Sequence, residues 1–235
     1  MIFPEKFQLK NKIAVVTGGA GLIGSAISLA LSEAGAKVYI GEIDTGIGKE
    51  LCSKIKNSGL HAQVIEMDIT SERSVESAVS DIIQSNGGID IWVNSAYPKT
   101  SDWGNKFEDV TLKSLRKNVD MHMNGYFICC KNVLEEMKKK KSGILINLGS
   151  LYGVLGPNFS IYEGTQMTMP AAYSLIKGGI VSFSRYLATY YAPYNIRVNV
   201  VCPGGVFDNQ SQAFIEKYNK LNPLGRMANP EEIAG

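Results

Sequence analysis

The chain has few of the residues from which metal sites and disulfide frameworks are built. It contains four cysteines and two histidines among 235 residues. The cysteines are Cys52, Cys129, Cys130 and Cys202. They form no CxxC pair, and neither His61 nor His122 stands at zinc-ligand spacing from them. We therefore expect no metal site, and we expect reduced thiols in a cytoplasmic protein.

The chain also lacks a marked excess of either charge and any long apolar run. Lysine and arginine total 24 against 22 aspartate and glutamate, which gives a net charge of +2. So small an excess does not concentrate nucleic acid or an anionic membrane. No segment approaches the roughly 20 uninterrupted apolar residues of a spanning helix, and the start, MIFPEKFQLKNK, has no signal-peptide core. We expect a small-molecule partner, with neither nucleic acid nor membrane.

Hydrophobic residues make up 45% of the chain and recur in two alternating patterns. Short β-branched runs predict strands over residues 12–17, 37–42, 61–67, 89–94, 143–148 and 196–201. Longer patterns predict helices over residues 22–34, 46–57, 72–85, 111–140 and 171–191. With no linker or repeat, this alternation predicts one α/β domain over residues 1–235. The alternation indicates βαβ units, which form a doubly wound parallel sheet with helices packed on its faces.

The first predicted strand runs into a glycine-rich turn, TGGAGLIG, that opens a helix. Gly18, Gly21 and Gly24 permit a tight turn and close approach of the backbone to a ligand. Leu22 and Ile23 begin the helix, whose N-terminus favours a pyrophosphate. The turn therefore predicts dinucleotide binding, although glycine turns also join strands to helices without any ligand.

The end of the second predicted strand indicates which dinucleotide binds. Glu42 lies 18 residues after Gly24, near the spacing at which an acidic residue accepts hydrogen bonds from the adenosine ribose. A carboxylate there repels a 2′-phosphate, and neither the glycine turn nor residues 41–44 contain Lys or Arg. These features favour NAD over NADP. The alternatives are a solvated glutamate at the strand end, and Asp44 sharing the ribose contact.

A YxxxK pair, Tyr173 and Lys177, lies on the predicted helix over 171–191, where residues four apart share a face. Tyrosine ordinarily titrates near 10, and lowering its pKa by about 3 units requires roughly 4 kcal/mol. We expect the Lys177 ammonium and a positively charged nicotinamide ring to lower the pKa of Tyr173. Ser150 follows the fifth predicted strand, at the sheet edge where open α/β folds bind ligands. Its hydroxyl is therefore placed to bond a substrate oxygen.

In this order the motifs resemble the short-chain dehydrogenase/reductase family across essentially the whole chain. The matching segments are TGGAGLIG at 17–24, MDIT at 67–70, VNSA at 93–96, NLGS at 147–150, YSLIK at 173–177 and RVN at 197–199, which runs into Pro203-Gly204. The resemblance implies a single Rossmann-type domain with an NAD(P) cofactor. It also implies that Tyr173 is the acid/base, that Lys177 orients the nicotinamide ribose and lowers the tyrosine pKa, and that Ser150 holds the substrate oxygen. Further implied cofactor-binding residues are Asp68 and Ile69 beside the adenine, Asn94 and Ala96 in the cofactor cleft, and Pro203, Gly204 and Val206 near the nicotinamide.

Several positions depart from the family pattern. Leu22 stands where the short members have glycine, and Tyr97 replaces the glycine that usually follows the NSA segment, so its ring is expected in the cleft. His122, three residues before Gly125, takes the place of an asparagine that holds a proton-relay water. An imidazole is both donor and acceptor, so we assign His122 as a fourth catalytic residue. The alternative is a buried histidine bonded to backbone. The threonine usual after the Pro-Gly pair is absent.

The interval between Ser150 and Tyr173 is longer than in the family's short members. Its added residues, within 154–170, are rich in Tyr, Asn, Gln, Thr and Glu. We expect them beside a polar, hydroxylated substrate; a surface elaboration without substrate contact is the alternative. The YEGTQMTMP segment resembles reductases of flagellin-glycan and nonulosonic-acid pathways, which implies a sugar or sugar-nucleotide substrate.

Together these features predict an NAD-dependent oxidoreductase that interconverts a secondary alcohol and a ketone. The alternatives are an NAD-retaining sugar-nucleotide epimerase or dehydratase, and a dinucleotide-sensing module without catalysis. The resemblance implies a homodimer or homotetramer formed through two long helices. It also implies a seventh strand after a short helix that begins near Pro230, so we expect the C-terminal strand to be missing from these 235 residues.

Overall fold

The computed structural model describes residues 7–235. Within that range six parallel strands form one sheet in the order β3-β2-β1-β4-β5-β6. The strands are β1 (Ile13–Thr17), β2 (Lys37–Glu42), β3 (Ala62–Glu66), β4 (Ile91–Asn94), β5 (Gly143–Leu148) and β6 (Ile196–Val201). The predicted fold class, a doubly wound parallel α/β sheet, is confirmed.

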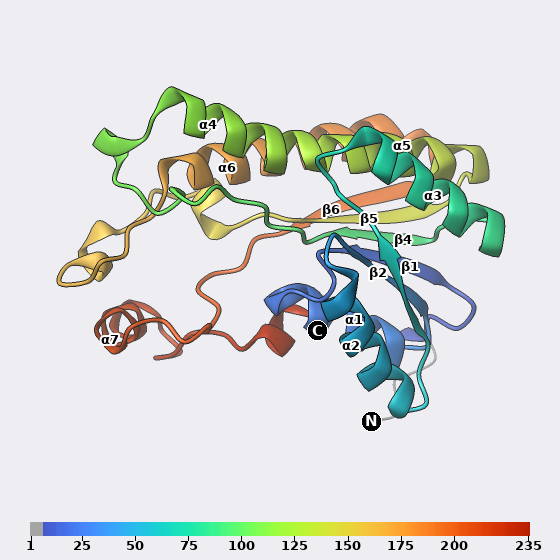
Figure 1. Cartoon of the computed structure of the whole chain (residues 1–235), viewed down its shortest axis with the longest axis horizontal. Coiled ribbons are helices and arrows are strands. Elements are labelled where there is room, and N and C mark those ends of the chain that lie inside the picture. The colour runs from blue at the N-terminus through green and yellow to red at the C-terminus, as the bar shows by residue number, and fades with distance from the viewer. Residues whose placement is uncertain (1–6) are drawn as a thin grey trace.

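Helices cover both faces of the sheet (Figure 1). One face is covered by α1 (Leu22–Glu33) and α2 (Thr45–Asn57). The opposite face is covered by α3 (Glu72–Asn86), α4 (Leu112–Asn118), α5 (Gly125–Lys140) and α6 (Ala171–Tyr191). Crossovers through helices on both faces are the connections that parallel strands require.

Each of the strands β1 to β5 contributes to two hydrophobic cores because successive side chains point to opposite faces, whereas β6 contributes to one. Val16, Val38 and Ile40 are fully buried in the core beneath α1 and α2. Trp92 and Leu145 are fully buried in the larger core beneath α3, α5 and α6. Burial on both faces accounts for the nearly continuous hydrophobic strands of the sequence. The packed sheet thereby fixes its carboxyl edge, from which the loops of the candidate site extend.

The single helix predicted over 111–140 is divided in the structure. α4 leads into a π-helical turn, Val119–Asn124, before α5 begins at Gly125. Such turns are rare in proteins, and those that occur are often found at functional sites. A Cβ on Gly125 would lie 2.9 Å from Cδ1 of Ile69, so the glycine lets the helix approach the end of β3 closely. The π-helical turn contains His122, which is fully buried.

Beyond β6 the chain forms α7 (Gln212–Leu221), a helix that the sequence patterns did not predict. α7 lies apart from the sheet (Figure 1). A 3₁₀ turn over Pro230–Ile233 begins at the predicted helix start. At its N-terminus the Glu232 carboxylate accepts a hydrogen bond from the Asn229 amide at 2.8 Å.

No helix that the structure describes combines the length and apolar content needed to cross a membrane. Among residues 7–235, no three His, Cys, Asp or Glu side chains come together as metal ligands would. The cysteines are free thiols, and three of the four are buried.

Candidate active site

A cavity of about 660 Å³ opens at the carboxyl edge of the sheet. Its walls come from segments that follow β1, β2, β4, β5 and β6, together with parts of α6 and α7. The strand order reverses between β1 and β4, which is the point where open α/β sheets bind ligands. The predicted site residues that line the cavity are Gly18, Gly21, Leu22, Ile23, Gly24, Glu42, Ser150, Tyr173, Lys177, Pro203, Gly204 and Val206.

The glycine turn leaves room for a ligand against the start of α1. Gly18 adopts a φ of +60°, and a Cβ there would lie 2.6 Å from Cα of Ala96. A Cβ on Gly24 would lie 2.1 Å from the Gly18 carbonyl oxygen. No side chain caps α1, and Leu22 and Ile23 line the cavity. Because the first amides of a helix lack intrahelical acceptors, this end of α1 fits the pyrophosphate of a dinucleotide.

Glu42 ends β2 beside the glycine turn. Its side chain accepts a hydrogen bond from the Ala20 amide at 2.8 Å, and the residue is 8% exposed. Burial raises the pKa of Glu42, and hydrogen bonds from the amides of Ala20 and Ile43 oppose that rise. Asp44 instead accepts from the Gly46 amide and caps α2. Of the two acidic residues, only Glu42 lines the cavity.

Ser150 and Tyr173 meet in the cavity. Ser150 follows β5, and its Oγ accepts from the Tyr152 amide at 3.1 Å. Tyr173 lies in the first turn of α6 and lines the same cavity. Burial raises the pKa of Tyr173, and the nearby Ser150 side chain opposes this rise only in part. The predicted lowering of the pKa of Tyr173 depends on a positively charged nicotinamide ring beside the phenol, so it stays a prediction.

Lys177 lies one helical turn beyond Tyr173 and is 4% exposed. Its Nζ donates to the Leu148 carbonyl at 2.7 Å and lies 3.4 Å from Nε2 of His122. Burial lowers the pKa of Lys177 to about 7, and the charge of Cys202 opposes this. Nζ lies 5.8 Å from the centre of the Tyr173 ring. The YxxxK spacing thus brings the amine and the phenol to one side of α6, as the sequence predicts.

His122 supports Lys177 from behind the cavity wall. Its ring centre lies 5.2 Å from that of Tyr97 and 5.1 Å from that of Tyr126. Burial, and next the charge of Lys177, lower the pKa of His122 well below its usual range, so the imidazole is neutral at pH 7. When Nε2 accepts from Lys177, the proton lies on Nδ1. Nδ1 is buried without a hydrogen-bond partner among the described residues, so the alternative of a histidine bonded to backbone is not what the structure has.

Asn94 and Ala96 were predicted to line the cofactor cleft, but neither is among the residues that line the cavity. Asn94 is fully buried because β4 lies in the middle of the sheet. Its side chain accepts from the Trp92 indole at 2.7 Å and donates to the Asn147 side chain at 2.8 Å, which joins β4 to β5. Ala96 packs against Gly18. Both residues therefore support the shape of the site by contacts inside the protein and do not line the cavity themselves.

Asp68 and Ile69 also lie outside the cavity wall. The Asp68 carboxylate accepts from the amide and the hydroxyl of Thr70, at 2.9 and 2.8 Å, so it is engaged in a local turn. Ile69 is 5% exposed and packs against Gly125. The adenine contacts expected of this pair stay a prediction.

Sequence reasoning missed most of the outer wall of the cavity. This outer wall consists of Tyr152, Tyr162, Met167, Thr168, Met169, Phe214, Tyr218 and Met227. Segment 154–170 was expected to present polar side chains, but those that reach the cavity are mostly aromatic or thioether. Asn158, for example, caps a short turn through the Ser160 amide. The length of the segment was the one available signal for this wall.

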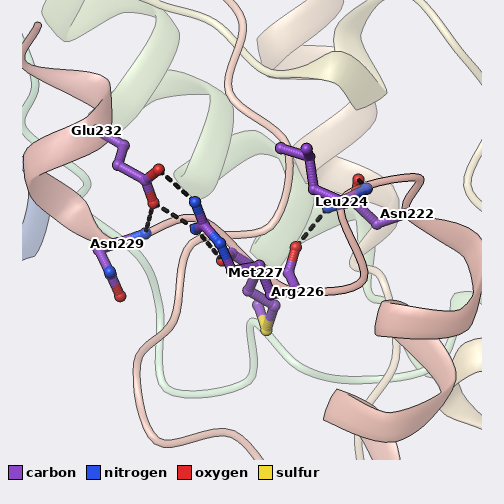
Figure 2. A network of polar contacts seen from close by, with 6 residues as sticks. All are labelled: Asn222, Leu224, Arg226, Met227, Asn229 and Glu232. Atoms are coloured by element: carbon purple, nitrogen blue, oxygen red, sulfur yellow. Dashed lines mark hydrogen bonds and ion pairs between the residues drawn. The ribbon is translucent and has the colours of Figure 1, made fainter.

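A polar network fixes the chain at Met227 (Figure 2). The Arg226 guanidinium meets the two carboxylate oxygens of Glu232 at 2.6 and 2.7 Å and donates to the Met227 carbonyl. Asn222 accepts from the Leu224 amide and donates to the Arg226 carbonyl. The hydrogen bond from Arg226 lowers the pKa of Glu232 to about 2. Met227, 6% exposed, is thereby held in the outer wall.

Comparison with known proteins agrees with this geometry. Residues 12–219 match the family model for short chain dehydrogenases. The chain is 32% identical over 230 residues to the post-translational flagellin modification protein A of Campylobacter coli, covering 97% of this chain and 90% of that protein. It is 32% identical over 237 residues to the 3-oxoacyl-(acyl-carrier-protein) reductase FabG of Aquifex aeolicus, covering 97% and 89%.

A solved structure has the same arrangement of elements. The NAD⁺-bound xylitol dehydrogenase matches with a TM-score of 0.85 at 26% identity, covering 98% of this chain and 91% of that one. The predicted family resemblance, including the likeness to a flagellin-modification protein, is confirmed. The chain belongs to the short-chain dehydrogenase/reductase family and is an NAD(P)-dependent oxidoreductase.

Proposed function

We propose that the protein is an NAD-dependent oxidoreductase that interconverts a secondary alcohol and a ketone on a polar substrate, with a sugar-derived compound as the substrate class. The observation that carries this proposal is one cavity lined by both a dinucleotide cradle and the Ser150, Tyr173 and Lys177 group. A hydride acceptor and an acid/base must meet at one carbon for this reaction, and the two halves of the cavity supply both places.

The preference for NAD over NADP rests on Glu42. Its buried carboxylate is fixed beside the glycine turn by the Ala20 amide. Among the described residues that line the cavity, the cations are Lys99, in the segment after β4, and Lys177, on α6. Neither comes from β2 or the glycine turn. At that end of the cavity the Glu42 carboxylate would therefore repel a 2′-phosphate, and neither lysine lies there to compensate.

The nicotinamide dinucleotide, when bound, supplies or accepts the hydride. In reduction, the Tyr173 phenol donates its proton to the substrate oxygen as the C–H bond forms, and the Ser150 hydroxyl holds that oxygen. In oxidation, the Tyr173 oxygen takes the hydroxyl proton as the C–H bond breaks. Burial raises the pKa of Tyr173, so the phenol is protonated near neutral pH and is ready for the reductive direction.

Lys177 and His122 complete the proposed proton path. A lysine with a pKa of about 7 gains and loses protons readily near neutral pH. Its Nζ is held by the Leu148 carbonyl and by Nε2 of His122. We assign His122 as the residue that positions this amine and passes protons from it, in place of the family's asparagine.

The test is a spectrophotometric assay at the nicotinamide absorbance, with NAD(H) and NADP(H) compared on a panel of polyols, sugars and sugar nucleotides. We expect turnover with NAD(H), and we expect Tyr173→Phe to lower it at least about 10²-fold. Tyr194→Phe, which removes a hydroxyl outside the cavity, is the matched control. Full activity in Tyr173→Phe, or a preference for NADP(H), would contradict the proposal.

The two alternatives give different results in the same assay. An epimerase or dehydratase that retains its cofactor would convert a sugar nucleotide without net NADH formation. A sensing module would bind the dinucleotide and turn over no substrate.

We also infer a homodimer or homotetramer. Aromatic rings form a ladder on the outer side of α5 and α6, with centre distances of 5.8 Å for Phe127–Phe183, 6.3 Å for Phe183–Tyr186 and 5.7 Å for Tyr186–Tyr190. Phe127, Tyr186 and Tyr190 are each more than half exposed. A contiguous exposed apolar face of this kind is typical of a protein interface.

A further inference from the structure

The outer half of the cavity must hold the substrate if the inner half holds the dinucleotide, so this inference rests on the proposed function. Its lining consists of Tyr97 and Lys99, which follow β4, and the outer wall defined above. Most of these side chains are aromatic rings or thioethers. They pack well against a carbon skeleton but offer few hydrogen bonds.

The Tyr218 hydroxyl of the outer wall already accepts a hydrogen bond from the Gly205 amide. Burial raises the pKa of Tyr152 and of Tyr162, so both phenols are uncharged at neutral pH. A charged group of a substrate must therefore find its main partner elsewhere in the lining.

Lys99 is the cation in the lining of the outer half. Among the ion pairs of the described residues, none involves Lys99, and its side chain is exposed. In the part of the chain that the structure describes, two carboxylates line the cavity: Glu42 is bonded to the glycine turn, and Asp208 follows β6, two strands away from β4. The Lys99 ammonium is therefore available to a ligand.

One aromatic ring separates Lys99 from the proposed acid/base. Nζ of Lys99 lies 5.7 Å from the centre of the Tyr97 ring, and that ring centre lies 6.1 Å from the ring centre of Tyr173. The Tyr97 ring packs edge-to-face against the Trp103 ring, with ring centres 5.7 Å apart, which holds it between the two groups. A small molecule that lies along Tyr97 reaches both Lys99 and Tyr173.

We propose that Lys99 is a substrate-binding residue and that the substrate is an anionic hydroxy or keto compound. The carbon skeleton packs on Tyr97, and a carboxylate or phosphate of the substrate pairs with the Lys99 ammonium. The reacting carbon then lies at Tyr173. This assigns a charge class to a substrate that the sequence indicates only as polar.

Binding tests the proposal without requiring turnover. Tyr173→Phe protein saturated with NADH is titrated calorimetrically with D-gluconate, D-glucose 6-phosphate and uncharged D-sorbitol, which share a hydroxylated six-carbon skeleton. We expect at least one anion to bind about tenfold more tightly than sorbitol. We expect this preference to weaken as NaCl is raised, because salt screens a partly exposed ion pair. The first two probes distinguish a carboxylate from a phosphate; no preference for either anion overturns the proposal.

Charge variants then test the residue. In the same background, Lys99→Gln should abolish the preference for the anion, whereas Lys113→Gln, an equal charge change on the exposed surface of α4, should keep it. In active protein, Lys99→Gln should raise KM for an anionic substrate about tenfold and leave kcat nearly unchanged. A preference that survives Lys99→Gln overturns the assignment. An anion preference in a protein that oxidises and reduces nothing removes the proposed function and keeps Lys99 only as an anion-binding residue.

Discussion

At the scale of single residues, the unusual feature of the site is a lysine held out of water. Lys177 is 4% exposed, and its Nζ has the Leu148 carbonyl and the His122 imidazole as partners, with no carboxylate beside it among residues 7–235. Desolvation therefore lowers the pKa of Lys177 to about 7. An unperturbed lysine titrates near 10.4. Burial of Lys177 thus lowers the free energy of unfolding at neutral pH, and it keeps a proton-exchanging amine beside Tyr173.

This cost predicts a pH dependence of the free energy of unfolding. Between about pH 7 and pH 10 the unfolded chain binds a proton at Lys177 that the folded protein does not. Stability therefore rises with pH across that range, by up to about 1.4 kcal/mol per pH unit, and the penalty is fully present below pH 7. Urea unfolding at pH 6.5, 8 and 9.5 measures it.

Variants isolate the contribution of Lys177 from other titrating groups. Lys177→Met should be most stabilised relative to the wild type at pH 6.5, and the difference should shrink as the pH rises. Lys113→Met, at an exposed position on α4, should leave the pH dependence of the wild type in place. A Lys177→Met difference that is constant from pH 6.5 to 9.5 contradicts the shifted pKa.

Residue types and spacing were enough to predict which side chains line the centre of the cavity. Ser150, Tyr173 and Lys177 follow from one strand end and one helix face. The raised pKa of Tyr173 could not be predicted in this way, because it depends on burial by segments distant in the sequence. The same holds for Asn94, whose amide faces Trp92 and Asn147 rather than the cavity.

At the scale of elements, segment 154–170 and α7 share a small core of their own. Ile161 and Tyr162 of the segment pack with Phe214 of α7 and with Met227, apart from the two cores of the sheet. Lys217 of α7 also donates to carbonyls in the segment. Five residues of the outer wall, Tyr162, Met169, Phe214, Tyr218 and Met227, therefore belong to one packed cluster built from distant stretches of chain.

This arrangement predicts local rather than global loss of structure when the small core is damaged. Phe214 is 6% exposed, and its ring centre lies 5.4 Å from that of Tyr162. A buried Phe→Ala change costs about 3–5 kcal/mol where the site cannot collapse. In Phe214→Ala we expect hydrogen exchange to accelerate in α7 and in segment 154–170, with little change in the strands.

The control for this change is Phe107→Ala, because Phe107 is 81% exposed. It should leave exchange in both segments unaltered. If Phe214→Ala instead accelerates exchange equally throughout β1 and β4, the small core is part of one cooperative unit with the sheet.

Element boundaries were predictable where a periodic pattern met a capping or turn residue. β2, β5 and β6 have the predicted bounds. The π-helical turn over Val119–Asn124 was not predicted, because one extra residue in a turn leaves the hydrophobic pattern of a long helix nearly intact. α7 was missed because it buries only Phe214 fully, so its apolar pattern is short.

At the scale of the whole molecule, two helices on one face of the sheet expose aromatic rings on their outer surface. α5 and α6 bury their inner sides on the sheet, yet the aromatic ladder of Phe127, Phe183, Tyr186 and Tyr190 lies on their outer side. In a symmetric dimer each ladder meets its own copy, so a single change alters the interface twice. This doubling makes the ladder sensitive to charge.

A carboxylate in the ladder should therefore separate the subunits. Tyr186 is 57% exposed, so Tyr186→Glu removes little packing from a single subunit. In the assembly it places two unpaired carboxylates in an apolar contact, which costs several kcal/mol, or about 10²-fold or more in the dissociation constant. We expect light scattering to give a multimeric mass for the wild type and for Leu224→Glu, since Leu224 is exposed outside the ladder, and a monomeric mass for Tyr186→Glu. Equal masses for the three proteins would show that the ladder does not join the subunits. If Tyr186→Glu also lowers the unfolding midpoint because association is lost, the midpoint of the wild type should rise with protein concentration and that of the variant should not.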